Sequence, residues 1–190
     1  MSEPAHLVPR IETSGQEAFR NAMRRFATTV SIVSCAHEGR WYGMSATAVS
    51  SVSVEPPALL VCINNATSTH RALSRSGRFC LNILRSSQPG LCKVFGGKIK
   101  GDDRFRVGDW RMQPNGSPFL FDAQANLFCQ LDQVTHYHTH TIFVARVYSI
   151  TAQQQVDPLV YQDGTYAVAK PIVDGGPKAA ADAVEGCLPY

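Results

Sequence analysis

Three histidines stand within five residues, in the segment His136-Tyr137-His138-Thr139-His140. If this segment is a strand, alternate residues share a face, and the three imidazoles would line up as metal ligands do. A lasting metal site also needs further ligands and partners that orient them, and the sequence identifies none. The alternatives are exposed loop histidines or a single catalytic histidine, and both are preferred to the metal site.

A second candidate region is the segment from Gly43 to Val52, in which small and hydroxylated residues stand where bulky ones would pack better. Small side chains let a flat ligand approach the backbone, whose amides can then bond the polar edge of a ring. Composition alone favours the alternative, a solvated edge strand.

Hydroxyl groups also gather at Thr67, Ser68 and Thr69, where an apolar run ends and a short helix is expected to begin. Free amides at a helix N-terminus bind phosphate readily. The alternative is ordinary capping by Ser68. Lys98 and Lys100, in a glycine-rich loop, could close on the same anion, although charged loops are usually only solvated.

Several common site types are excluded. The sequence has no G-x-G-x-x-G and no G-x-x-x-x-G-K-[ST] motif, so neither a Rossmann nor a P-loop cradle is expected. The segment Gly43-Met44-Ser45-Ala46-Thr47 lacks the last glycine of G-x-S-x-G, which argues against a serine hydrolase. The six cysteines contain no C-x-x-C pair, which excludes simple zinc ribbons and thioredoxin-type sites.

Length and charge narrow the class of protein further. A chain of 190 residues, 44% hydrophobic, is expected to form one domain. Its net charge of +3 is too small and scattered to predict a nucleic-acid surface. There is no apolar run long enough to cross a membrane and no apolar signal segment near the start, so a soluble cytoplasmic protein is expected.

The elements that must position these residues are mostly strands. The S-x-x-E spacing of Ser14 and Glu17 predicts a helix from about Gly15 to Ala27. Two shorter helices are expected, from Ser68 to before Gly77 and from about Ser87 to Phe95, the latter stopped by Gly96-Gly97. The expected strands are Val30–Cys35, Trp41–Val54, Ala58–Ile63, Phe79–Leu84, Ala125–Val134, Thr141–Ile150, Leu159–Gln162 and Thr165–Val168, with a loop over 96–118.

So many strands with so few helices favour a closed or nearly closed antiparallel barrel, because closure removes exposed edges. We expect a flexible tail over residues 1–12, one domain over 13–170 and a second flexible tail over 171–190.

Taken in order, the segments resemble the flavin reductase family, small FMN-binding split barrels that serve as reductase components of two-component flavin-dependent monooxygenases. The resemblance covers about residues 19–168. It rests on Phe19-Arg20-Asn21-Ala22-Met23, Gly43 to Val54 with Pro56-Pro57, Val61-Cys62-Ile63-Asn64, Phe79 to Leu84, Phe95-Gly96-Gly97, and His140 to Val144.

This resemblance implies a mainly β fold, an antiparallel split β-barrel of Greek-key type with a few short flanking helices. It implies that the isoalloxazine ring contacts Ser45, Ala46, Thr47, Ala48, Ser51 and Val52, and that Thr67, Ser68, Thr69 and Lys100 hold the flavin phosphate. His140 matches the histidine of the family's Gly-Asp-His motif, near which the nicotinamide lies, and the sequence has His138-Thr139 in place of Gly-Asp.

The implied activity is transfer of hydride from NADH or NADPH to FMN or FAD, with reduced flavin diffusing to a partner monooxygenase. The family typically forms homodimers, for which the first helix and Trp41 are candidate interface elements. The alternatives are a split-barrel flavoprotein that keeps its flavin and acts on its own substrate, and the histidine metal-binding module.

Overall fold

The computed structural model describes residues 15–99, 101–114 and 116–171. Ser14 and Lys100 lie outside these ranges. So do the two predicted tails, except that Pro171, the first residue of the second tail, is described. In the described part, no helix is long and apolar enough to cross a membrane.

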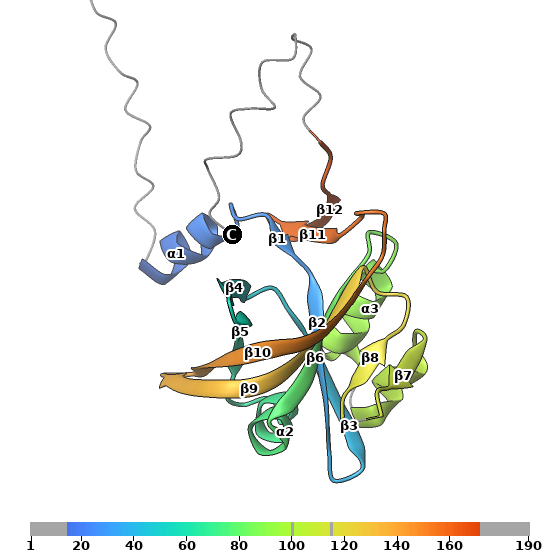
Figure 1. Cartoon of the computed structure of the whole chain (residues 1–190). Helices are drawn as coiled ribbons and strands as arrows, with labels where there is room; N and C mark the ends of the chain where they lie inside the picture. Colours follow the sequence, from blue (N-terminus) through green and yellow to red (C-terminus); the bar gives the residue numbers. More distant parts are fainter. Residues whose placement is uncertain (1–14, 100, 115, 172–190) are drawn as a thin grey trace, which may run out of the picture.

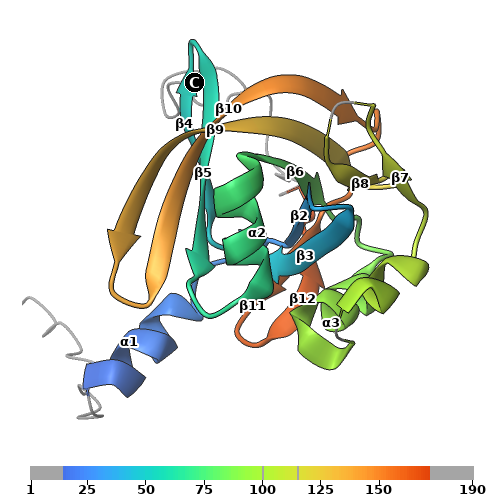
Figure 2. The ribbon, with the colours of Figure 1, turned by 90° about the horizontal axis from the view of Figure 1, so that it is seen from below.

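A seven-stranded antiparallel sheet forms the body of the molecule, with the strand order β3-β2-β6-β9-β10-β5-β4 (Figure 1). Its strands are β2 (Ser31–His37), β3 (Arg40–Ala46), β4 (Val49–Val54), β5 (Pro57–Asn64), β6 (Arg78–Ile83), β9 (Ala125–Tyr137) and β10 (His140–Ala152). The pairing of β9 with β10 shifts register between Val144 and Ala145 and between Val147 and Ser149. Such irregularities bend strands, and Figure 2 shows both strands curving over the domain.

Two small sheets flank this body. One has the order β1-β11-β12 and joins β1 (Thr28–Thr29), β11 (Leu159–Gln162) and β12 (Thr165–Val168). The other is the pair β7 (Trp110–Met112) and β8 (Pro118–Leu120), which lies within the stretch expected to be a loop.

The helices are short. They are α1 (Gly15–Met23), α2 (Ser68–Ser76), α3 (Pro89–Lys93), the π-helical turn η1 (Val94–Lys98) and the 3-10 turn η2 (Gly101–Arg106). The predicted α2 is confirmed, and it ends where Gly77 takes a left-handed φ of 65°. The predicted end of the first helix is wrong, because α1 ends at Met23, short of Ala27. The third helix begins at Pro89, and the backbone leaves the helical conformation at Gly97, whose φ is 109°, close to the predicted stop at Gly96-Gly97.

The main core lies inside the curled sheet. Val33 of β2, Ala46 of β3, Val61 of β5 and Phe143 of β10 are all buried in one cluster. Since β3 and β5 stand far apart in the strand order yet pack on one core, the sheet curls into a nearly closed antiparallel barrel, as predicted, with β3 and β4 at its edges. The helix α2 contributes Leu73 to the same cluster, which fixes the helix against the barrel.

A second apolar cluster holds α3, η1 and η2 against the outside of the barrel. It includes Ile32 of β2, Phe95 of η1, Phe105 of η2 and Leu120 of β8. Trp41 packs edge-on against Phe105, with ring centroids 5.3 Å apart. Trp41 therefore has a packing role within its own chain.

The expected strand Trp41–Val54 is interrupted. It divides into β3 and β4 at Thr47 and Ala48, where the amide of Val49 donates to the carbonyl of Thr47 at 3.1 Å and the amide of Cys62 donates to that of Ala48 at 2.9 Å. The interruption places Thr47 and Ala48 at a rim of the barrel and makes β4 an edge strand.

Candidate active site

The end of β3 forms one wall of a hollow of about 440 Å³. Ser45, Ala46 and Thr47 line it. Gly96 of η1 lies opposite, since a Cβ built on Gly96 would stand 3.5 Å from the Ser45 hydroxyl. The glycine thus lets η1 approach β3 closely, and the wall that results is made of small side chains and backbone.

The remaining walls of this hollow come from residues that the sequence does not mark. They are Val30, Cys92, Lys93, Lys98, Tyr161 and Tyr166. The pKa of Tyr166 is raised to about 12, chiefly by burial and to a smaller extent by the neighbouring Cys92. The phenol therefore stays neutral and can donate a hydrogen bond. Lys93, Gly96 and Lys98 are exposed, so the hollow opens to solvent.

A second hollow, of about 380 Å³, adjoins the first and shares Thr47 and Tyr161 with it. Ala48 lines it together with Phe19, Met23 and Phe26 from α1 and the turn that follows it. Ala48 therefore lies beside the other predicted ring-binding residues. Ser51 and Val52 lie further along the edge strand β4, where both are exposed, and they line neither hollow.

The predicted phosphate residues lie at the start of α2. Thr67 is the N-cap, because its hydroxyl accepts from the His70 amide at 3.1 Å, so the cap is Thr67 and not Ser68. Ser68 is exposed, and Thr69 is buried at 2% exposure, so Thr69 can offer a ligand only its backbone amide. The first amides of a helix have no internal acceptor, which leaves them free for an anion.

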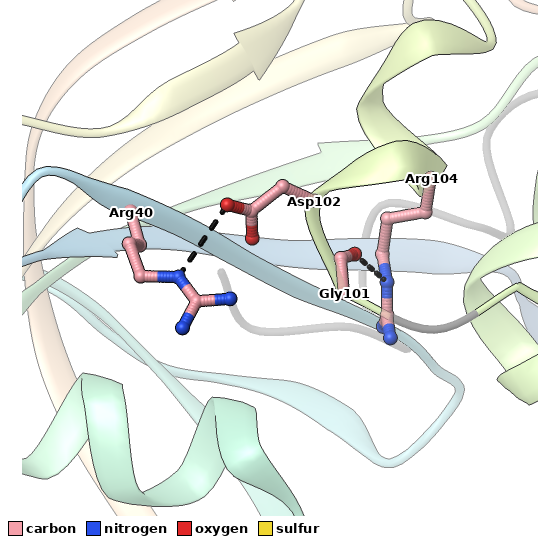
Figure 3. Close-up of polar contacts among 4 residues, drawn as sticks. All are labelled: Arg40, Gly101, Asp102 and Arg104. Carbon is pink, nitrogen blue, oxygen red and sulfur yellow. Dashed lines mark hydrogen bonds and ion pairs between the residues drawn. The ribbon is translucent and has the colours of Figure 1, made fainter.

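Ser68 faces a third hollow, of about 460 Å³, between α2, β3 and η2. Four arginines line it: Arg40, Arg71, Arg75 and Arg104. Figure 3 shows the polar contacts of η2 beside it, with the Arg40 Nε 3.5 Å from Asp102 and the Arg104 Nε donating to the Gly101 carbonyl at 2.9 Å. Arg104 also donates to the Gly43 carbonyl of β3, which ties η2 to the strand.

The ring-binding and phosphate-binding candidates are linked through β3. Gly43 lines the hollow that Ser68 faces, and Ser45 lines the hollow of about 440 Å³. Two residues span about 7 Å along a strand, so one flavin with its ribityl phosphate can reach from the hollow at Ser45 to the hollow that Ser68 faces. Lys100 adjoins this region in sequence but lies outside the described residues.

The three clustered histidines do not share one strand. His136 lies in β9, one residue before its end, His138 stands in the turn with φ of 48°, and His140 begins β10. Within residues 15–99, 101–114 and 116–171, no group of three His, Cys, Asp or Glu is arranged to hold a metal ion. The strand geometry on which the metal hypothesis rested is therefore wrong, because the chain reverses at His138 and Thr139.

The same hairpin is tied to the start of α2 by polar contacts. Asn65 donates from its side chain to the His138 carbonyl and from its backbone to the Thr139 carbonyl, both at 3.0 Å. The buried Thr141 hydroxyl donates to the Asn65 side chain at 2.7 Å. The turn that carries His140 and the turn that precedes α2 therefore form one hydrogen-bonded unit.

Comparison with known proteins agrees with this architecture. An NADH:FAD oxidoreductase of Streptomyces globisporus C-1027, solved in complex with NAD and FAD fragments, superposes with a TM-score of 0.78 at 25% identity, over 84% of this chain and 96% of that one. The FADH(2)-dependent resorcinol hydroxylase, reductase component, of Rhizobium sp. (strain MTP-10005) is 40% identical over 155 residues, 80% of this chain and 87% of that protein. The FMN reductase (NADH) RutF of Methylorubrum extorquens is 37% identical over 149 residues, 78% of this chain and 73% of that protein.

The fold is thus that of the split-barrel flavin reductases, as the sequence predicted. The family model described as a flavin reductase like domain matches residues 23–170. The chain belongs to the flavin reductase family.

Proposed function

We propose that this protein is an NAD(P)H:flavin oxidoreductase that reduces FMN or FAD and releases the reduced flavin to a partner flavin-dependent monooxygenase. The names of its relatives support the proposal, since one is the reductase component of a hydroxylase and another is an NADH-dependent FMN reductase. The observation that carries it is the small-residue hollow at Ser45, Ala46 and Thr47, which suits the face of a flat ring.

In this proposal the isoalloxazine ring lies against Ser45, Ala46, Thr47 and Ala48, with Ser51 and Val52 further along the strand. The backbone amides at the β3 end can bond the polar edge of the ring. Thr67, Ser68 and the amide of Thr69 hold the phosphate together with Lys100. Helix N-terminal amides and a nearby ammonium group both favour a doubly negative phosphate.

His140 is the proposed nicotinamide-positioning residue. Its Nδ1 lies 2.9 Å from the hydroxyl of Thr139, the residue that stands where the family motif has Asp. A hydroxyl at this position can fix the imidazole plane without adding a negative charge. With both ligands bound, the reaction is transfer of hydride from the nicotinamide to the flavin, and the protein contributes chiefly by holding the two rings at reacting distance.

The open hollow suits a flavin that exchanges with solution. Lys93 and Lys98 at its rim are exposed, so a bound flavin would remain accessible to water and could leave after reduction. A prosthetic flavin would call for deeper burial. The proposed product is therefore diffusible reduced flavin.

We also propose that the protein is a homodimer and that α1 lies in its interface. None of the residues of α1 is buried within the chain, and Phe19, Met23 and Phe26, of the helix and the turn after it, are 65%, 46% and 61% exposed. An apolar face of this kind is covered in a stable protein. Since these side chains line the hollow that contains Thr47 and Ala48, a second subunit seated there would also border the flavin site.

Two experiments test these proposals. Flavin-dependent oxidation of NADH by the purified protein tests the activity. Sedimentation of the wild type and of Phe19→Ser with Met23→Ser tests the assembly, with a dimer expected for the first and a monomer for the second. A wild-type monomer at micromolar concentration would contradict the dimer and leave the activity to be judged by its own assay.

A further inference from the structure

The part of the hairpin between β9 and β10 that carries His140 has no buried residue of its own. Every residue from Asp132 to His140 is exposed, and we call this segment the hairpin tip. The pairing of β10 with β5 begins only at His140, which stands opposite Asn64. A segment with so little buried apolar surface depends on polar contacts for a fixed position. The place of His140 is therefore set by the polar contacts at the base of the tip.

Thr141 is the centre of these contacts. Its side chain is fully buried, in the inward-facing row of β10 that continues with Phe143. Three groups surround its hydroxyl: Asn65 Oδ1 at 2.7 Å, His70 Nε2 at 2.9 Å and His136 Nδ1 at 2.9 Å. These partners come from the turn before α2, from α2 and from β9. One hydroxyl thus joins the base of the tip to the start of α2.

The direction of these bonds follows from what each group can do. A hydroxyl has one proton to donate and two lone pairs that accept. The Asn65 oxygen can only accept, and the nitrogen of the same amide donates to the His138 carbonyl at 3.0 Å. The Thr141 proton therefore goes to Asn65, and both imidazoles donate to Thr141. The hydroxyl is saturated, so a side chain without one cannot hold the three partners together.

The orientation of His70 shows how closely this network is specified. Burial lowers the pKa of its imidazole, so the ring is uncharged and has one proton, which is on Nε2. Its Nδ1 is then buried with no partner among the described residues, although buried polar atoms without partners are rare. His70 lies on α2, which Leu73 anchors in the main core. The network therefore fixes the hairpin tip to a rigid part of the barrel.

We propose that Thr141 is a positioning residue for hydride transfer, because its hydroxyl fixes the hairpin tip and thereby the position of His140 beside the nicotinamide. The inference rests on the proposed function, in which His140 contacts the nicotinamide and the start of α2 holds the flavin phosphate. Thr141 is buried and touches neither ligand. It holds the two binding elements in register, and its effect on the reaction passes through His140.

The test measures the reduction of FMN and of FAD by NADH in stopped-flow experiments, and the dissociation constant of each flavin by fluorescence. Thr141→Val keeps the shape of the side chain and removes the hydroxyl, whereas Thr141→Ser keeps the hydroxyl. Each variant is measured alone and together with His140→Ala. Thr135→Val is the matched control, since it makes the same change at an exposed position of the same hairpin.

Thr141→Val should raise the KM for NADH or slow hydride transfer by about tenfold, with flavin affinity changed by less than about twofold. Thr141→Ser and Thr135→Val should stay within about twofold of the wild type. When His140→Ala is already present, Thr141→Val should add less than about twofold, because the residue through which it acts is gone.

His136→Leu is a milder variant, because His136 is exposed and its loss leaves the bond between Thr141 and Asn65 in place. It should give the same pattern with an effect of about threefold, which again disappears in the presence of His140→Ala. If Thr141→Val does not fold, the comparison of His136→Leu with and without His140→Ala decides.

Four results would overturn the proposal. They are an effect of Thr141→Val that persists with His140→Ala, equal losses of NADH and flavin binding, wild-type kinetics in Thr141→Val, and no recovery in a folded Thr141→Ser. If His140→Ala leaves the NADH kinetics unchanged, the inference fails as well, while the reductase activity stands. A folded wild type that reduces neither flavin would overturn the proposed function itself.

Discussion

The hydroxyl of Thr139 lies 2.9 Å from Nδ1 of His140, where the turn between β9 and β10 ends. The two residues are neighbours in sequence, and the turn that holds them is fixed by the two hydrogen bonds from Asn65. In the proposed site, this hydroxyl would orient His140 in place of the Asp of the family motif.

Thr139→Val keeps the size of the side chain and removes the hydroxyl, so His140 loses its orienting partner. We expect a higher KM for NADH or slower hydride transfer, by about threefold to tenfold, because one neutral hydrogen bond contributes about 0.5–1.5 kcal/mol. Flavin affinity should stay unchanged. Stopped-flow reduction of flavin at several NADH concentrations measures both quantities.

Thr139→Asp provides the rescue, because it restores the acidic residue of the family motif. Recovery of wild-type kinetics in this variant would mark Thr139 as a positioning residue. His140→Ala should show the same defect to a larger degree, again with flavin binding intact. Loss of folding or of flavin binding in His140→Ala would show instead that the histidine is structural.

Lys100→Ala should weaken flavin binding by about 1–3 kcal/mol, the range for losing a charge-assisted hydrogen bond to phosphate. Titration of the variant with FMN and with FAD measures the change. Lys170→Ala removes the same charge from an exposed position near the end of the described chain and serves as the control. An unchanged dissociation constant in Lys100→Ala would remove this residue from the phosphate site.

The fully buried Asn82 joins three parts of the fold. Its amide nitrogen donates to the Ile32 carbonyl and to the Ser34 hydroxyl, both at 2.8 Å, and its oxygen accepts from the Leu120 amide at 2.8 Å. Asn82→Ala would leave these buried groups without partners, so the free energy of unfolding should fall by about 2–4 kcal/mol. Urea unfolding checks this, with Gln153→Ala at an exposed position expected to cost less than about 0.5 kcal/mol.

Stability should decrease toward acid pH through His70. Burial lowers the pKa of this imidazole, and the nearby His136 and Arg71 lower it further. In the unfolded chain this residue has a pKa of about 6.5, so it takes up a proton at pH values where the folded protein does not. The free energy of unfolding therefore falls as the pH drops through that value. His70→Gln should show a shallower loss of stability between about pH 7.5 and about pH 5.5 in urea titrations. Equal slopes for the two proteins would contradict this origin.

Much of the fold could be predicted because local chemistry and tertiary structure agree. The apolar run Ala58–Ile63 lies within β5, and the stop signal at Gly77 ends α2. Prediction was less exact at the histidine segment. The expected strands ended at Val134 and began at Thr141, whereas β9 continues to Tyr137 and β10 begins at His140. The turn is this short because His138 takes a left-handed φ of 48°.

The candidate site could be predicted only in part, because some of its residues come together only in the folded protein. Ser45 to Ala48 stand out by their small size, and the start of α2 stands out by its hydroxyls. Tyr161 and Tyr166 reach the hollow because β11 and β12 fold back across it, which no local pattern indicates. The arginine-lined hollow draws on β3, α2 and η2, whose residues are far apart in sequence and meet only in the folded protein.

The most direct measurement is NADH oxidation by the purified protein, followed by the loss of nicotinamide absorbance with FMN, with FAD and with no added flavin. The account predicts turnover that requires added flavin and rises with its concentration until saturation, since the hollow at Ser45 to Thr47 would hold a flavin that exchanges with solution. A well-folded protein that binds no flavin and oxidises no NADH under any of the three conditions would contradict it.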